Sequence, residues 1–137
     1  MKKIIAVILF ISILFGGNQK FLSPEEAFKL QTISNQKDIV FKLDLGKDIY
    51  LYHDKLKVNI LQPEKIEITN ELDIPKIEMY KGLQTISRNI YLKISNEFLK
   101  SKVKAGEYQL EFNYQGCSKA GICYPPMKKK IGHVITE

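Results

Sequence analysis

The chain has 137 residues, a length that fits one domain with a modest hydrophobic core. Hydrophobic residues make up 45% of it and charged residues 26%, a balance that excludes an intrinsically disordered chain. The formal net charge of +6 comes from dispersed lysines, with Arg88 as the only arginine, whereas nucleic-acid-binding modules usually cluster their arginines. We therefore expect a folded domain with no nucleic-acid partner.

The N-terminus has the pattern of a secretory signal peptide. Two lysines are followed by an apolar run over residues 4–15, which is shorter than the about 20 residues of a membrane-spanning helix. Gly16 and Gly17 are small, but the sequence has no A-x-A cleavage site, so an uncleaved anchor is the alternative. We predict a signal peptide over residues 1–17 and a domain over 21–137 outside the cytoplasm, where disulfides persist.

A short helix is predicted to open the domain. Ser23 can cap a helix, Pro24 suits the first helical position, and Glu26 stands where a capping box needs its carboxylate. We expect the helix to run to about Leu30, before the sequence TISNQKD breaks the pattern.

From residue 39 onward, hydrophobic and polar residues alternate in short runs bounded by turn sequences such as LGKD, QPEK and KAGE. This alternation is typical of antiparallel strands that bury one face. The residues expected to point inward are Ile39, Phe41, Leu43, Leu45, Leu56, Val58, Ile60, Ile66, Ile68, Ile90, Leu92, Ile94, Tyr108, Leu110, Phe112 and Tyr114.

About seven short strands and the lack of a long helix pattern after Leu30 favour an all-β immunoglobulin-like sandwich, and a small closed barrel is the alternative. One long stretch, residues 70–89, lacks the alternation but carries the apolar residues Ile77, Met79, Tyr80 and Leu83. Irregular loops longer than about 12 residues are often lids or binding loops. We therefore expect this stretch to be functional.

The only two cysteines, Cys117 and Cys123, lie in the segment YQGCSKAGICYPPM. Cysteine pairs outside the cytoplasm usually form disulfides, and composition alone favours a structural bond. However, a bond across a loop of about seven residues gains only about 2 kcal/mol before strain. Gly116 and Gly121 permit unusual backbone angles, and Lys119 supplies a cation that favours a thiolate. The residues leave a structural bond and a reactive dithiol both open.

Other chemistries have little support. Two cysteines cannot complete a four-ligand zinc site, and His53 and His133 are the only histidines. Nucleophilic hydrolysis lacks a G-x-S-x-G motif, and Cys–His catalysis would need a free thiol in an oxidising compartment. We predict no metal and no cofactor.

The segment YQGCSKAGICYPP resembles the N-terminal periplasmic domain of the DsbD family of thiol:disulfide interchange proteins. The family pattern is Y-Q-G-C, a short loop and C-Y-P-P, and residues 114–126 match it throughout. FLSPEEAF, IYLYHDKLKV and IEMYKG are similar to the family's N-terminal segment, its tyrosine-bearing strand and the cap loop over its cysteines. The resemblance spans nearly all of residues 21–137 and implies an immunoglobulin-like fold in the periplasm.

The resemblance also implies residue roles. Cys123 would form the mixed disulfide with partners, and Cys117 would resolve it. Met79 stands where the family commonly has Phe, and Ile77 where it has an acidic residue, which leaves Glu78 as the carboxylate candidate for tuning the thiols. Without the resemblance, Met79 and the tyrosines could equally fill the edge of the core. The surroundings of the cysteines would comprise Tyr50, Tyr52, Glu78, Met79, Tyr80 and Tyr124.

The implied function is thiol:disulfide oxidoreduction through a reversible Cys117–Cys123 disulfide. A thioredoxin-like domain fed by a membrane electron carrier would reduce the pair, which would then reduce a periplasmic disulfide isomerase or a cytochrome c maturation thioredoxin. The chain contains neither upstream partner, so we expect a stand-alone module with a separate reductant or a part of a longer protein. The alternative is a non-catalytic secreted β-sandwich binding module with a structural disulfide.

Overall fold

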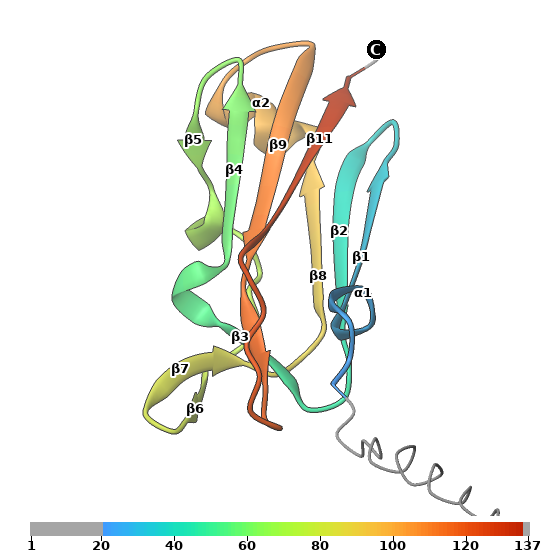
Figure 1. Ribbon diagram of the computed structural model, residues 1–137. Coiled ribbons are helices and arrows are strands. Elements are labelled where there is room, and N and C mark those ends of the chain that lie inside the picture. Colours follow the sequence, from blue (N-terminus) through green and yellow to red (C-terminus); the bar gives the residue numbers. More distant parts are fainter. Residues whose placement is uncertain (1–20, 136–137) are drawn as a thin grey trace, which may run out of the picture.

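The computed structural model describes residues 21–135, so the predicted signal peptide lies outside the described residues. Two antiparallel sheets face each other, and a third sheet of shorter strands lies at one end of the molecule (Figure 1). The helices in this range are short, and none of them has the length and apolarity needed to cross a membrane.

Helix α1 (Pro24–Ala27) precedes the first strand. The predicted capping box is confirmed: the Ser23 hydroxyl accepts from the Glu26 N–H, and the Glu26 carboxylate accepts from the Ser23 N–H. The predicted extension to Leu30 is wrong, because strand β1 (Phe28–Ser34) begins directly after the helix. A single helical turn gains little stability by itself, whereas Phe28 gains a buried position and ladder hydrogen bonds in the sheet.

The two main sheets contain strands β1, β2 (Asp38–Leu45), β4 (Lys57–Gln62), β5 (Ile66–Glu67), β8 (Ile90–Ser95), β9 (Glu107–Tyr114) and β11 (Met127–Val134). The strand order is β1-β2-β8 in the first sheet and β11-β9-β4-β5 in the second. All of these neighbours pair antiparallel. In Figure 1, β1 and β2 lie on the right and β4 and β5 on the left.

The hydrophobic core fills the space between these sheets. Phe41 of β2 stacks on Phe112 of β9 with 4.9 Å between the ring centroids, so aromatic side chains join the two layers. The inward residues predicted from the alternation are buried, apart from Leu45 and Ile66, which are half-buried. The predicted all-β sandwich with a short N-terminal helix is confirmed.

Two elements depart from the sequence-based expectation. Helix α2 (Asn96–Lys102) follows β8, capped by the Ser95 hydroxyl, and it buries Leu99. Strand β11 has the sequence MKKKIGHV, whose three adjacent lysines hide any alternation. It forms an edge of its sheet, where exposed lysines are tolerated because they discourage pairing with other chains.

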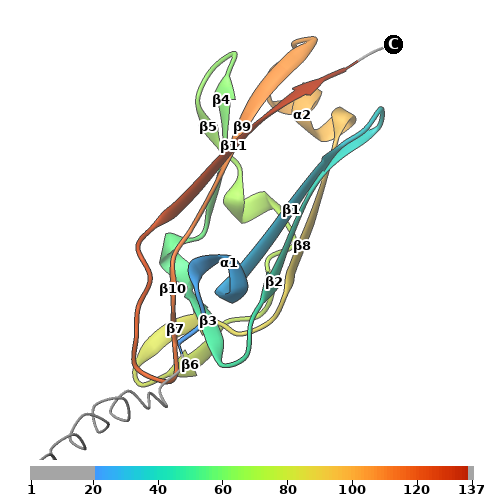
Figure 2. The same ribbon diagram turned by 45° about the vertical axis from the view of Figure 1, so that its right-hand side comes forward.

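The third sheet has the order β10-β3-β7-β6 and contains β3 (Ile49–Tyr52), β6 (Glu78–Tyr80), β7 (Leu83–Ile86) and β10 (Gly116–Ser118). The stretch 70–89 is therefore not irregular throughout, because β6 and β7 form a hairpin within it. Its turn residues Lys81 and Gly82 both have positive φ, as a two-residue hairpin turn requires. We call residues 78–86 the cap hairpin; Figure 2 shows it beside β3 and β10 at the lower end of the molecule.

Candidate functional site

Cys117 and Cys123 form a disulfide across a small hairpin. Cys117 lies on β10, and Cys123 lies directly opposite it, with 3.9 Å between the two Cα atoms. Backbone hydrogen bonds flank the pair, from the Ser118 N–H to the Ile122 carbonyl at 2.8 Å and from the Tyr124 N–H to the Gly116 carbonyl at 3.0 Å. The disulfide therefore joins a pair of side chains that the backbone already places face to face.

The two sulfurs differ in their surroundings. Cys117 is buried with 1% of its surface exposed, whereas Cys123 is exposed. The Tyr52 hydroxyl lies 2.9 Å from the Cys117 sulfur and 3.7 Å from the Cys123 sulfur. A reagent from solvent would therefore meet Cys123 first, while Cys117 has a phenol as its hydrogen-bond partner.

Strand pairing brings these residues together. Cys117 is opposite Tyr50 in the β10–β3 ladder, and Tyr52 lies on the same face as Tyr50 because strand side chains alternate. Gly116 permits the close approach of the two strands, since a Cβ at this position would lie 2.1 Å from the Tyr50 carbonyl oxygen. The glycine of the YQGC motif thus has a steric role that only the pairing reveals.

The cap hairpin contacts this face through Tyr80. The rings of Tyr50 and Tyr80 lie 4.9 Å apart, and those of Tyr50 and Tyr52 lie 6.1 Å apart. Burial raises the pKa of Tyr50, and the neighbouring Tyr52 and Tyr80 raise it further, so its hydroxyl stays protonated at neutral pH. Lys119 and Lys81 place their ammonium groups 5.0 Å and 5.4 Å from the centroid of the Tyr80 ring.

The other predicted cap residues, Glu78 and Met79, are exposed. Met79 is 65% exposed and lines a hollow together with Tyr52 and Asp54. The Glu78 carboxylate faces Arg88 at 3.9 Å, and both side chains are exposed. Tyr80 is thus the cap residue with a ring contact to the tyrosines beside the disulfide.

Tyr124 ties the disulfide hairpin to the N-terminal segment. Its hydroxyl donates to the Leu22 carbonyl at 2.7 Å, and its buried ring meets the Phe28 ring at 5.2 Å. Gln115 was not singled out by the sequence, yet its amide donates to the Tyr124 carbonyl and its own carbonyl accepts from the Tyr52 N–H. Its place next to Gly116 in the motif was the available signal.

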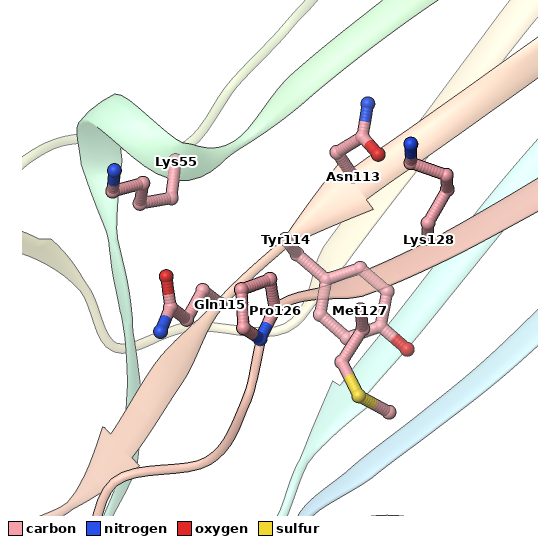
Figure 3. A pocket seen from close by; sticks show the side chains of 7 residues that line it. All are labelled: Lys55, Asn113, Tyr114, Gln115, Pro126, Met127 and Lys128. Atoms are coloured by element: carbon pink, nitrogen blue, oxygen red, sulfur yellow. The ribbon is translucent and has the colours of Figure 1, made fainter.

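A hollow of about 270 Å³ lies behind this hairpin, with Lys55 and Lys128 on opposite sides in the view of Figure 3. Its lining comes from the 3-10 helix His53–Lys55, from the end of β9 with the residue after it, and from the start of β11 with the residue before it, so no local pattern indicated it. Its lining residues are Lys55, Asn113, Tyr114, Gln115, Pro126, Met127 and Lys128.

Known proteins are similar to this chain in sequence and in fold. Residues 18–135 match the family described as the N-terminal domain of thiol:disulfide interchange protein DsbD. DsbD of Campylobacter jejuni strain RM1221 is 31% identical over 105 residues, which cover 77% of this chain and 18% of that protein. DsbD of Citrobacter koseri is 28% identical over 115 residues, which cover 84% of this chain and 20% of that protein. The chain thus spans about a fifth of the length of these relatives.

Solved structures agree on the fold. The reduced DsbD N-terminal domain of Neisseria meningitidis is similar with a TM-score of 0.55 at 20% identity, covering 82% of this chain and 89% of that one. The same domain in complex with the PilB N-terminal domain also has a TM-score of 0.55 at 20% identity, covering 83% and 88%. These findings confirm the immunoglobulin-like fold and the resemblance of the cysteine segment. The chain belongs to the family of the N-terminal domain of the thiol:disulfide interchange protein DsbD.

Proposed function

We propose that this domain is an extracytoplasmic thiol–disulfide exchange module that carries electrons through the Cys117–Cys123 pair. The observation that carries the proposal is the asymmetry of the disulfide. Cys123 is open to solvent, whereas Cys117 is buried with the Tyr52 hydroxyl 2.9 Å from its sulfur. This arrangement supports Cys123 as the sulfur that partners attack and Cys117 as the resolving cysteine.

Reduction of the domain would proceed in two displacements. A partner thiolate attacks the Cys123 sulfur, the disulfide breaks, and the electron pair leaves on the Cys117 sulfur as a thiolate. The Tyr52 O–H is placed to donate to that thiolate. A second partner thiol loses its proton to solvent and attacks the partner's own sulfur, which releases the Cys123 thiolate. The partner ends as a disulfide and the domain gains two electrons.

The reduced pair would pass its electrons on by the reverse chemistry. The Cys123 thiolate attacks a partner disulfide, and Cys117 then resolves the mixed disulfide, a step made effectively intramolecular by the neighbouring positions of the two residues. The cap hairpin would shield the dithiol through Tyr80, with Glu78 and Met79 at its outer side.

The proposed partners follow the family. A thioredoxin-like reductant fed by a membrane electron carrier would lie upstream, and a periplasmic disulfide isomerase or a cytochrome c maturation thioredoxin would lie downstream. The complex of the Neisseria meningitidis relative with the PilB N-terminal domain supports a protein partner for this fold. The predicted signal peptide and the disulfide itself support a periplasmic location.

A structural role for the disulfide is not favoured. The bond joins residues only 6 positions apart, so it removes little conformational freedom from the unfolded chain. A binding module stabilised by this bond would also have no use for the difference between an exposed and a buried sulfur.

Two measurements test the exchange function. Equilibration with glutathione should give a reduction potential above about −300 mV, whereas a lower potential would indicate a permanent structural bond. For the second, the oxidised domain is treated briefly with reduced glutathione and quenched with iodoacetamide, and its peptides are mapped by mass spectrometry. We expect glutathione on Cys123 and the carbamidomethyl group on Cys117; the opposite pattern would contradict the assigned roles.

A further inference from the structure

Two ammonium groups converge on one ring beside the disulfide. Lys119 comes from the loop between the cysteines, and Lys81 comes from the turn of the cap hairpin. Both lie over the ring of Tyr80, at 5.0 Å and 5.4 Å from its centroid. Tyr80 in turn packs against Tyr50, which is the ladder partner of Cys117.

The positions of these charges are set by the fold. The Lys119 N–H donates to the Asp48 carbonyl at 2.8 Å, which anchors the disulfide loop beside β3. The face of an aromatic ring attracts cations, so Tyr80 holds both side chains at the site instead of leaving them free in solvent. Two ammonium groups repel each other, so their common location over the Tyr80 ring indicates that the ring attracts both.

The charges are not neutralised by ion pairs. Within residues 21–135, neither Lys119 nor Lys81 has a carboxylate within 4.0 Å. Glu78, the carboxylate of the same hairpin, faces Arg88 instead. The exposed Asp48 and Asp54 are the other acids on the adjoining segments, and they leave both ammonium groups unpaired.

We propose that Lys81 and Lys119 form a basic rim that favours attack on Cys123 by thiols with an additional negative charge nearby. By the same rule, the protein partner would carry acidic residues beside its reactive cysteine. The inference rests on the proposed exchange at Cys123 and adds the chemistry of the partner. The attacking group is a thiolate, and an exposed cation attracts it over a screening length of about 8 Å at physiological salt. A partner surface with lysines around its cysteine would be repelled, which gives the rim a role in specificity.

The test uses three small thiols of similar size and different charge: 2-mercaptoethanesulfonate, 2-mercaptoethanol and cysteamine. Each rate constant for reduction of the oxidised domain is divided by the rate constant of the same thiol with the neutral 2-hydroxyethyl disulfide, which removes differences in intrinsic reactivity. We expect the normalised rate of the sulfonate to exceed that of cysteamine about three- to tenfold at low salt. The preference should vanish in about 1 M salt, where the screening length is about 3 Å.

Variants separate the effect of the basic rim on the thiol preference from the effect of the net charge of the domain. The double substitution Lys81→Met and Lys119→Met should abolish the preference, and Lys119→Arg should retain it because Arg also binds aromatic faces. Tyr80→Leu leaves the net charge unchanged but removes the ring, so the preference should shrink. Lys104→Met is the matched control: Lys104 follows α2, at the opposite end of the molecule from β6 and β7 (Figure 1), so its loss should leave the preference intact.

A pair of cysteine peptides extends the test to polypeptide partners. One peptide has glutamates around its cysteine, the other has lysines, and mixed disulfides on Cys123 are quantified by mass spectrometry. After normalisation, we expect the acidic peptide to react faster with the wild type than with the double variant. Equal ratios in the two proteins, for thiols or peptides, would overturn the basic rim. A potential below about −300 mV would instead overturn the proposed exchange function, so the two failures are distinguishable.

Discussion

The hydroxyl of Tyr52 lies 2.9 Å from the sulfur of Cys117, although 65 positions separate the two residues in the sequence. In the proposed exchange, this contact would give the buried sulfur a hydrogen-bond donor when the disulfide breaks. It also distinguishes the two cysteines, since the distance from the same hydroxyl to the Cys123 sulfur is 3.7 Å.

Replacing Tyr52 with Phe should slow reduction of the disulfide. The variant keeps the ring but loses the O–H that, in the proposed exchange, would donate to the leaving Cys117 thiolate, and a hydrogen bond to a charged group is worth about 1.5 kcal/mol or more. We expect the rate constant for reduction by dithiothreitol to fall about tenfold. Tyr91→Phe, at an exposed position on β8, is the control. An unchanged rate in Tyr52→Phe would show that the phenol does not act on the thiolate.

Gly116→Ala should destabilise the domain. The added methyl group would meet the Tyr50 carbonyl oxygen at 2.1 Å, so β10 and β3 would have to separate. We expect a loss of about 2–3 kcal/mol in the free energy of unfolding, measured by urea denaturation. Gly132→Ala on β11 is the matched control, because a Cβ there meets nothing within 4 Å. Equal stability of the two variants would contradict the steric role of Gly116.

Acidification should destabilise the domain through His133. This residue is fully buried, with its Nδ1 2.6 Å from the Ser34 hydroxyl and its Nε2 2.7 Å from Oδ1, the side-chain amide oxygen, of Asn96. The Asn96 oxygen can only accept, so the proton sits on Nε2 and the Ser34 hydroxyl donates to Nδ1. Both ring nitrogens are therefore satisfied in the neutral imidazole.

Burial lowers the pKa of His133, while the nearby Asp38 raises it by a smaller amount. The unfolded chain therefore binds the proton at higher pH than the folded domain, and stability falls as the pH drops below about 6.5. The loss from this group is at most about 1.4 kcal/mol per pH unit. His133→Gln should flatten the profile of unfolding free energy between about pH 7 and pH 5. An equally steep profile in the variant would assign the pH dependence to other groups.

Removing both cysteines should separate stability from exchange. The double variant Cys117→Ala and Cys123→Ala loses a bond between positions 6 apart, so we expect a cost of only about 2 kcal/mol and retention of the fold. Thiol–disulfide exchange should be absent. Circular dichroism and denaturation measure the first effect, and the second is checked with glutathione. An unfolded double variant would favour the structural role for the bond.

The site was less accessible to sequence reasoning than the fold. The motif identified both cysteines, and the resemblance pointed to Tyr52 and Tyr80, but no pattern ranked Tyr80 over Met79 as the residue in ring contact with Tyr50. The direction of a side chain in a twisted hairpin depends on its turn and on the neighbouring sheet, which are not local properties.

The sequence by itself determined the all-β class and, through the residues around its two cysteines, the resemblance to the family. Alternation such as that of Tyr108, Leu110 and Phe112 is a local, period-two signal that survives without knowledge of partners. The sequence did not predict strand β11, because it is an edge strand with three adjacent lysines, or helix α2, because it is only about two turns long. Only the tertiary structure decided which sulfur is buried and where the ammonium of Lys119 lies. Burial and placement of charge depend on the pairing of β10 with β3 and of β3 with the cap hairpin, contacts between segments that are far apart in the chain.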